Sequence, residues 1–249
     1  MIRKGGSSVC REFLRGLKDI LPVLAACLPF GFVLGTVARA AGLSLGQVSL
    51  MAGLNFAGGS EFAAMELWTS PPNVLLIVAI IFLVNSRLIL MGAVLAPLVA
   101  HLPRRRVLPS LFLMCDAAWA AALADAYRHR DESGPKFSMA YFLGAGSGMY
   151  VVWLGSTTMG AMCGPLLGDP RVLGLDMAFP AVFLSLLKGM WRGWLKAVPW
   201  FAALTIAALT YSFIPGAWYV PAGSLGGTAT AWLIAVLEGR KAAREADNV

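Results

Sequence analysis

The chain alternates between long apolar runs and short polar stretches that carry most of its charges. Most of the runs approach the roughly 20 residues that an α-helix needs to cross the hydrocarbon core of a bilayer. The pattern therefore predicts a polytopic membrane protein built from helices. The eight runs cover about residues 20–38, 48–68, 74–100, 107–126, 137–162, 175–187, 197–214 and 218–237.

The sixth run is too short to span a bilayer, because only 13 residues separate Gly174 from Lys188 and Pro180 interrupts them. If this run alone fails to cross, the two termini lie on opposite sides of the membrane. Both ends of the chain are basic, however, which predicts that both termini are cytoplasmic. A second run must then fail to cross, and 48–68 is the best candidate, because it contains adjacent glycines and two carboxylates.

The composition agrees with this pattern, since 58% of the 249 residues are hydrophobic and 13% are charged. A soluble domain carries about 25% charged residues. The net charge is +7, but the cations lie between apolar runs and at the ends, which is typical of membrane topology rather than nucleic-acid binding. The four cysteines lack the spacing of metal ligands, and both histidines lie between runs. We therefore expect no metal, no cofactor and no nucleic-acid partner.

The two segments predicted not to cross resemble each other. When 53–66 is set over 174–187, Gly, Leu, Ala and Phe match at four places, and Asn55 pairs with Asp176. Two such segments, each between full spans, suggest inverted halves that meet near the membrane midplane. The sequence thus predicts an all-α, polytopic membrane helical bundle of two inverted pseudo-repeats, each with three spans plus one broken or re-entrant segment. The expected parts are a cytoplasmic amphipathic lead-in at 1–18, a single transmembrane domain at 19–238 with pseudo-repeats at about 19–127 and 137–238, and a cytoplasmic tail at 239–249.

The stretch 53–68 places polar groups inside apolar surroundings. A charged side chain in hydrocarbon is costly, which makes Glu61 a functional candidate by default. The adjacent glycines loosen a helix and free backbone groups, which must find partners in protein or in a water-filled cavity. A broken helix with polar ends at membrane depth is typical of a transport site. We predict a substrate site at Asn55, Gly58, Gly59, Ser60 and Glu61, and the structural alternative for Glu61 is a capping role at a restarted helix.

Arg87 lies about half-way along the third run, too deep to reach the membrane surface easily. It needs a carboxylate partner or an anionic substrate, and its planar guanidinium suits a substrate carboxylate. The structural alternative is a fixed ion pair with Glu61 or Asp116. Asp116 begins a surface of small residues that favours close helix packing, while its carboxylate could relay a proton. Glu61 and Asp116 are therefore the candidates for proton coupling.

Further residues complete this hypothesis. Asn85 shares the third run with Arg87 and is predicted to face the same site, which Asp176 and Pro180 would close from the second half. An apolar wall would receive a branched side chain, although the same residues could simply fill the contacts between helices. The predicted wall comprises Phe56, Phe62, Met177, Phe179 and Phe183.

A series of motifs resembles the AzlC family: LPFGFVLG, FAGGSEF, NSRLILMG followed by Pro97, CDAAW, WLGSTTMGAMCG and GLDMAFPAVFLSLL, in that order. The resemblance covers about residues 21–187. It implies the large subunit of a branched-chain amino acid exporter in the bacterial inner membrane, which works with a small hydrophobic AzlD-type subunit. The implied substrates are leucine, isoleucine and valine, with methionine as a further candidate, and export would be coupled to the proton gradient.

Two positions depart from the family pattern. Family members often carry Gln at the position of Glu61 and His at the position of Leu88, so this chain gains a titratable carboxylate and lacks a potential proton carrier. Two alternatives stay open: export of another small amino acid or organic solute, and a non-transporting membrane scaffold or enzyme. We do not expect an enzyme, because the chain offers no convincing pair of catalytic side chains.

Overall fold

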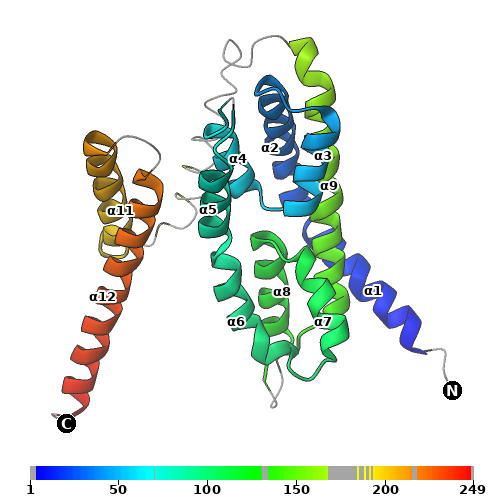
Figure 1. The fold of residues 1–249 in the computed structure, drawn as a ribbon. Coiled ribbons are helices and arrows are strands. Elements are labelled where there is room, and N and C mark those ends of the chain that lie inside the picture. The colour runs from blue at the N-terminus through cyan, green and yellow to red at the C-terminus, as the bar shows by residue number, and fades with distance from the viewer. Residues whose placement is uncertain are drawn as a thin grey trace. The chain divides into compact units, whose positions relative to one another are not determined.

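The structure is a computed structural model that describes residues 4–69, 71–130, 134–167, 193–214 and 218–247, together with Leu184, Lys188 and Trp191. Within these residues every regular element is a helix (Figure 1), which confirms the predicted all-α membrane bundle. Three helices in the described part of the chain are long and apolar enough to cross a membrane, namely Leu21–Ala40, Val74–Val99 and Tyr219–Glu238.

The chain divides into two compact units: Met1–Ser70 with Ile81–Phe179 form unit 1, and Pro71–Ile80 with Pro180–Val249 form unit 2. Helix α5 contributes its last residues to unit 1, and α11 and α12 belong to unit 2. The elements in chain order are α1 (Lys4–Asp19), α2 (Leu21–Ala40), α3 (Leu45–Asn55), α4 (Gly58–Glu66), α5 (Val74–Asn85), α6 (Arg87–Val99), α7 (Arg104–Ser110), the 3₁₀ turn η1 (Leu111–Leu113), α8 (Asp116–Arg128), α9 (Met139–Leu167), α11 (Trp194–Phe213) and α12 (Tyr219–Asp247).

Helix α9 is the axis of unit 1, and α2 runs beside it. Its 29 residues reach about 43 Å at a rise of about 1.5 Å per residue, which exceeds the thickness of a bilayer core. The two helices are parallel, because Gly31 of α2 lies beside Ser156 and Thr36 lies beside Gly164. A Cβ atom at Gly31 would overlap the Ser156 hydroxyl. Small residues thus allow the close helix contact that is typical of membrane proteins.

The predicted broken segment 48–68 forms a hairpin of two short helices, α3 and α4 (Figure 1). Helix α3 runs antiparallel to α9: Ser49 Oγ lies 3.0 Å from Thr158 Oγ1, and farther along the Tyr150 hydroxyl donates a hydrogen bond of 3.0 Å to the Gly53 carbonyl. α3 then ends, and α4 turns back. The segment is therefore broken, as predicted, about half-way along α9.

The fourth apolar run, predicted to span, is instead a second hairpin. Residues 107–126 are divided among α7, η1 and α8, and the backbone is extended at Met114 and Cys115. η1 reaches the middle of α9, where the rings of Phe112 and Tyr150 are 5.7 Å apart. α8 then returns toward the beginning of α9 (Figure 1). The prediction failed because length and hydropathy are the same for one crossing helix and for two half-length helices.

The third run bends where α5 gives way to α6. The backbone N–H and the hydroxyl of Ser86 both donate to the Leu83 carbonyl, at 3.3 and 2.7 Å, so a tighter turn interrupts the helix. Arg87 is the first residue of α6. The bend thus places Arg87 at a helix N-terminus in the middle of a 26-residue candidate span.

The amphipathic lead-in contains α1, which packs on the beginning of α9. A Cβ atom at Gly16 would overlap the carbonyl of Tyr141. Arg15 donates two hydrogen bonds, of 2.6 and 2.9 Å, to the Asp125 carboxylate of α8. These bonds raise the pKa of the Arg15 guanidinium above its usual range. Arg15 also lies 4.8 Å from the centre of the Tyr141 ring, so one cation ties α1 to both α8 and α9.

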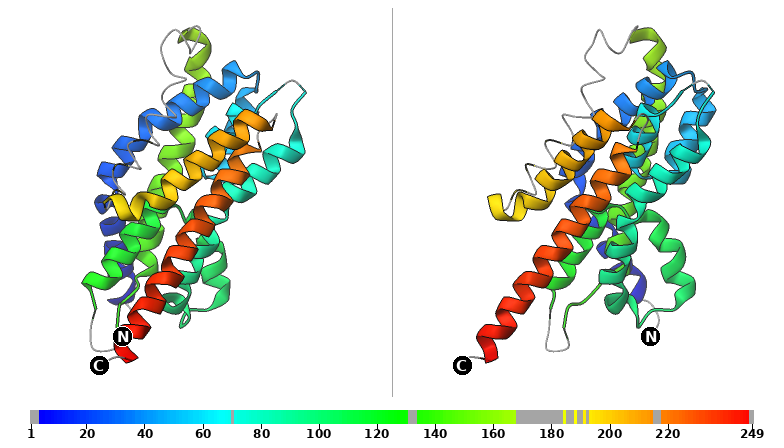
Figure 2. Two further views of the ribbon diagram at one scale, coloured as in Figure 1. Left: turned by 90° about the vertical axis from the view of Figure 1, so that its left-hand side faces the viewer. Right: turned by 60° about the vertical axis from the view of Figure 1, so that its left-hand side comes forward.

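In unit 2, α11 and α12 form an antiparallel pair (Figure 2). Gly223 of α12 faces Ala203 and Ala207, while Gly227 faces Pro199 and Ala203 nearer the start of α11. Small residues again allow close packing. The segment 174–187 lies outside the described residues except for Leu184, and with it lie Asp176, Met177, Phe179, Pro180 and Phe183. The second broken segment and the second pseudo-repeat therefore stay predictions. The first pseudo-repeat was predicted with three spans, and it lacks the third, because 107–126 forms a hairpin.

Candidate functional site

The two hairpins enter unit 1 from opposite ends of α9 and meet beside Tyr150. The ring of Phe56, at the break of the first hairpin, lies 5.2 Å from the Tyr150 ring. The ring of Phe112, just before the break of the second, lies 5.7 Å from it on an edge-to-face contact. Interrupted backbone from two parts of the sequence is thus gathered about half-way along α9. Such breaks at membrane depth are tolerated only where protein or water satisfies the freed groups.

The first break lies at Phe56 and Ala57. Phe56 adopts the left-handed conformation, with φ 46° and ψ 43°, and is the only non-glycine residue with a positive φ among the described residues. This conformation costs a side-chain-bearing residue about 1–2 kcal/mol, so packing must hold it. The sequence had placed the break at Gly58 and Gly59, but these residues open α4 instead. Gly58 is needed for another reason: a Cβ atom there would lie 2.6 Å from the Trp153 ring.

Glu61 is fully buried, with 0% of its surface exposed, inside a set of hydrogen-bond donors. Trp153 Nε1 donates to Oε2 at 2.9 Å, and the backbone N–H of Ala57 and the amide of Asn55 donate to Oε1 at 3.2 and 3.4 Å. The bond to Ala57 caps the N-terminus of α4, which confirms the structural alternative for this residue. Within the described residues Glu61 has no ion-pair partner, so the predicted pairing with Arg87 does not form.

Asn55 connects this carboxylate to the third run. Its amide donates to Ser60 Oγ at 2.9 Å, while its oxygen accepts from Asn85 Nδ2 at 3.3 Å. Ser60 is fully buried and donates to the Ala57 carbonyl. The side-chain oxygen of Asn85, Oδ1, is buried and has no hydrogen-bond partner in the described part of the protein. One acceptor in the network is therefore unsatisfied.

Arg87 and Asp116 form an ion pair where α6 and α8 begin. Arg87 Nη2 lies 2.9 Å from Asp116 Oδ2, which confirms one of the two predicted ion pairs. In contrast to Glu61, these side chains are open, with 45% and 59% of their surfaces exposed. Asp116 also opens α8, where a negative charge compensates the positive end of the helix dipole.

The helix directions give the site a further property. α4 and α8 belong to opposite hairpins, and both begin at the breaks near the middle of α9. Each helix therefore directs its partly positive N-terminus at this level, with one carboxylate in its first turn. Half-helices of this kind bind the charged groups of small solutes in transporters with discontinuous helices.

The structure brings together most of the described residues that the sequence predicted. Asn55, Ser60, Glu61 and Asn85 share one hydrogen-bond network, and Gly58 and Gly59 form the first turn of α4. Arg87 pairs with Asp116. Phe56 and Phe62 are buried, at 7% and 6% exposure, so they pack between helices rather than line an open wall.

Sequence reasoning missed Tyr150 and Trp153. Both lie on α9 three residues apart, which places them on the same side of the helix. Tyr150 holds α3 through the Gly53 carbonyl, and Trp153 holds the Glu61 carboxylate. The sequence did carry a signal for these two residues. Each is an aromatic residue with a hydrogen-bond donor in the middle of an apolar run, and such a donor needs a partner when it is buried.

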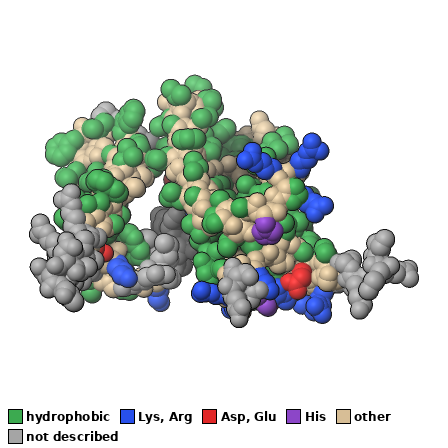
Figure 3. Space-filling model, turned by 90° about the horizontal axis from the view of Figure 1, so that it is seen from below, with side chains coloured by type: hydrophobic (Ala, Val, Ile, Leu, Met, Phe, Trp, Pro, Cys, Tyr) green, Lys and Arg blue, Asp and Glu red, His purple; other side chains and the backbone are tan. Residues whose placement is uncertain are grey.

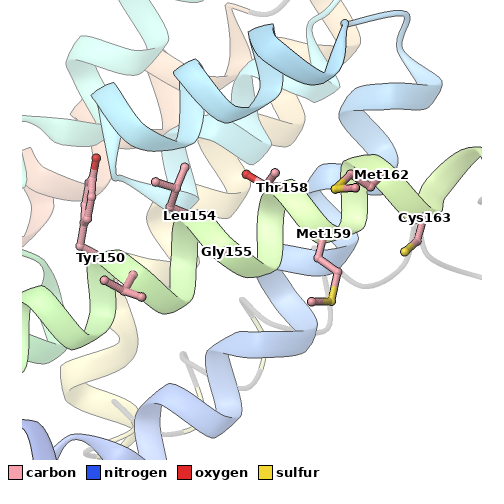
Figure 4. A pocket seen from close by; sticks show the side chains of 8 residues that line it. Tyr150, Leu154, Gly155, Thr158, Met159, Met162 and Cys163 are labelled. Atoms are coloured by element: carbon pink, nitrogen blue, oxygen red, sulfur yellow. The ribbon is translucent and has the colours of Figure 1, made fainter.

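An apolar groove of about 520 Å³ adjoins the site along α9 (Figure 4). Tyr150 forms one end and Cys163 lies at the other, with Gly155 and Met159 between them. The groove has almost no polar lining, so it suits hydrocarbon rather than a charged group. Among the described residues no cluster of His, Cys, Asp or Glu has the arrangement of a metal site.

Comparisons with known proteins agree on the class of this protein. A family model described as AzlC protein matches residues 22–167, which include both hairpins. The chain is 29% identical over 183 residues to an "Uncharacterized membrane protein" of Archaeoglobus fulgidus, a match that covers 73% of this chain and 77% of that protein. It is 26% identical over 232 residues to "Inner membrane protein YgaZ" of Escherichia coli, covering 91% of this chain and 92% of that protein. No solved structure matches. The protein is thus an integral membrane protein that belongs to the AzlC family.

Proposed function

We propose that this protein is a secondary transporter that exports branched-chain amino acids across the bacterial inner membrane. The observation that carries the proposal is the meeting of two half-helix hairpins from opposite ends of α9. Discontinuous helices with their N-termini near mid-membrane are the substrate sites of several transporter folds. Membership of a transport-associated family and the membrane relatives support the same class of function.

The substrate would lie between the two hairpins. Asn55 and Asn85, which are half-buried, supply one polar wall, and the fully buried Ser60 and Glu61 hold Asn55 in place through hydrogen bonds. The open pair of Arg87 and Asp116 supplies charges for the ends of an amino acid. A planar guanidinium suits the substrate carboxylate. Export would be coupled to protons through Glu61 and Asp116, the two carboxylates at the helix N-termini. Asp176 and Pro180 remain candidates for closing the site from the second half.

The orientation follows from the cations. Exposed arginines lie at the end of unit 1 where α7 begins and α8 ends, and Figure 3 shows Lys and Arg side chains gathered at this end. Cytoplasmic loops carry an excess of such residues. This end, which also holds α1 and the N-terminus, would therefore face the cytoplasm. Because 48–68 and 107–126 both turn back, a cytoplasmic C-terminus would require the run 175–187 to cross the membrane. We further propose that a small AzlD-type membrane subunit assembles with the chain.

Leucine counterflow tests the proposal. The chain and its small partner are reconstituted in liposomes loaded with leucine, and uptake of radiolabelled leucine is measured. We expect saturable exchange that Glu61→Gln and Arg87→Gln reduce at least tenfold. Glu66→Gln is the matched control, because this exposed carboxylate lies at the other end of α4.

The same assay separates the alternatives. Exchange of other small solutes with no response to leucine, isoleucine or valine would replace the substrate class. Exchange that does not saturate over the millimolar range would indicate a channel. Absence of all exchange, with normal assembly of both variants, would indicate a scaffold. Chemical turnover in detergent, where no gradient exists, would indicate an enzyme.

A further inference from the structure

We infer that the ion pair of Arg87 and Asp116 is exchangeable: a zwitterionic substrate opens it and takes the place of each partner, so the pair selects zwitterions. The substrate's carboxylate replaces Asp116 on Arg87, and its ammonium group replaces Arg87 on Asp116. The inference rests on the proposed function and adds a requirement to it, namely that both charges are present on one substrate molecule. It also assigns Asp116 a role in specificity.

Comparison with another arginine–aspartate pair among the described residues of unit 1 supports the replacement of each partner by a ligand. Arg15 binds Asp125 through two nitrogens and two oxygens, at 2.6 and 2.9 Å, and the Asp125 side chain is 5% exposed. Arg87 Nη2 lies 2.9 Å from Asp116 Oδ2, and these two side chains are 45% and 59% exposed. A bidentate pair whose carboxylate is buried is built to stay closed, even though the Arg15 side chain is 30% exposed. Two side chains that are both about half exposed leave donors and acceptors within reach of a ligand.

The positions of the two residues supply the second argument. Arg87 begins α6 at the bend of the third run, and Asp116 begins α8 at the break of the second hairpin. Both pieces of backbone start at an interruption, so small changes at the bend or the break can separate the two side chains without breaking a regular helix. Two residues before Arg87, the buried oxygen of Asn85 offers a further acceptor that no described group satisfies. An ammonium group needs such acceptors.

Electrostatics gives the reason for selecting zwitterions. Opening the pair alone leaves two charges without partners at membrane depth, which is costly. An amine satisfies only Asp116, and a carboxylic acid satisfies only Arg87, so each leaves one charge uncompensated. A zwitterion satisfies both charges together. The site therefore rejects singly charged analogues even when their hydrocarbon chain is correct.

A binding assay on the purified chain with its small partner tests the inference. Radiolabelled leucine is displaced by unlabelled leucine, by 4-methylpentanoate, which lacks the amine, and by 3-methylbutan-1-amine, which lacks the carboxylate. We expect both analogues to compete roughly tenfold to a hundredfold more weakly than leucine, the range for loss of a hydrogen bond to a charged group. Measurement in detergent avoids any effect of the analogues on membrane gradients.

Two variants should change specificity in opposite directions. Asp116→Asn leaves Arg87 as an uncompensated cation, so the affinity for 4-methylpentanoate relative to that for leucine should rise by about tenfold. Arg87→Gln leaves Asp116 as an uncompensated anion, so the relative affinity for 3-methylbutan-1-amine should rise instead. Glu66→Gln is the control and should change neither ratio. Thermal unfolding in the same detergent verifies that each variant is folded, and Arg87→Lys, which keeps the charge, should retain the original order of ligands.

The outcomes distinguish this inference from the proposed function. If the unaltered protein binds and exchanges no leucine, the proposed function fails and the inference fails with it. If leucine binds but both analogues compete as well as unlabelled leucine does, the inference of an exchangeable ion pair is wrong, while the proposed transport function stands. The same conclusion follows if the two variants shift specificity in the same direction. A purely structural ion pair would lower stability in both variants without reversing the preference for the analogues.

Discussion

The substitution Gly58→Ala probes the closest contact in the candidate site. The added Cβ atom would lie 2.6 Å from Cη2 and 2.7 Å from Cζ2 of Trp153, whereas carbon atoms pack at about 3.5–4.0 Å. The indole must therefore retreat by about 1 Å. Its Nε1 now donates to Glu61 at 2.9 Å, and a retreat of that size would take the bond beyond the usual range. Overpacking costs about 1–3 kcal/mol, and a lost bond to a charged group costs about 1.5–3 kcal/mol. Together these two costs give an expected destabilisation of about 2.5–6 kcal/mol.

Gly155→Ala is the matched control for this substitution. Gly155 lies on α9, two residues beyond Trp153, and a Cβ atom there would meet nothing within 4 Å. An exposed Gly→Ala change inside a helix stabilises by up to about 1 kcal/mol. Thermal unfolding in one detergent, together with leucine binding, compares the two variants. We expect Gly58→Ala to unfold at a lower temperature and to bind leucine weakly, and Gly155→Ala to match the unaltered protein. Equal behaviour would refute the placement of Trp153 against the start of α4.

Two further predictions test the fold of unit 1. The first uses a chain whose four cysteines are replaced by serine. Arg104→Cys and Arg128→Cys in this chain should react with a membrane-impermeant maleimide from the same side of the membrane, because both lie at the base of the second hairpin. Labelling from opposite sides would show that 107–126 crosses the membrane. Arg15→Gln removes the two Arg15 hydrogen bonds from the buried Asp125, which among the described residues keeps only the His129 contact of 3.2 Å, and should lower the free energy of unfolding by about 3 kcal/mol. Lys18→Gln on the exposed side of α1 should change it by less than about 0.5 kcal/mol. Similar unfolding temperatures for the two variants would contradict the anchoring role of Arg15.

The first hairpin was predictable because its polar residues have no other explanation in an apolar run. Glu61 cannot face lipid, so burial among donors was the expected solution. The position of the break was not predictable in the same way. It depends on Phe56, whose left-handed backbone is held by packing against Tyr150, and no propensity scale selects a phenylalanine for that conformation.

The second hairpin escaped prediction for a different reason. Hydropathy reports the apolar length of 107–126, and that length is the same for a straight crossing and for a return at half depth. Asp116 was noticed as a polar residue, but only the structure makes it the first residue of a helix. The same fact changes the meaning of Arg87, which the sequence left between two partners. Asp116 rather than Glu61 is within reach, because α8 and α6 begin side by side at their interruptions.

By itself the sequence determined that this protein lies in a membrane, that it is all-helical, and which few polar residues lie in its apolar runs. These follow from local quantities, namely the length and hydropathy of each run and the cost of charge in hydrocarbon. Only the tertiary structure decided which polar residues meet. Glu61 pairs with Trp153 across 92 positions of sequence, and Tyr150 receives the ends of both hairpins. Such contacts depend on where a helix stops and turns back, which is set by packing against α9 and is not encoded in any single run.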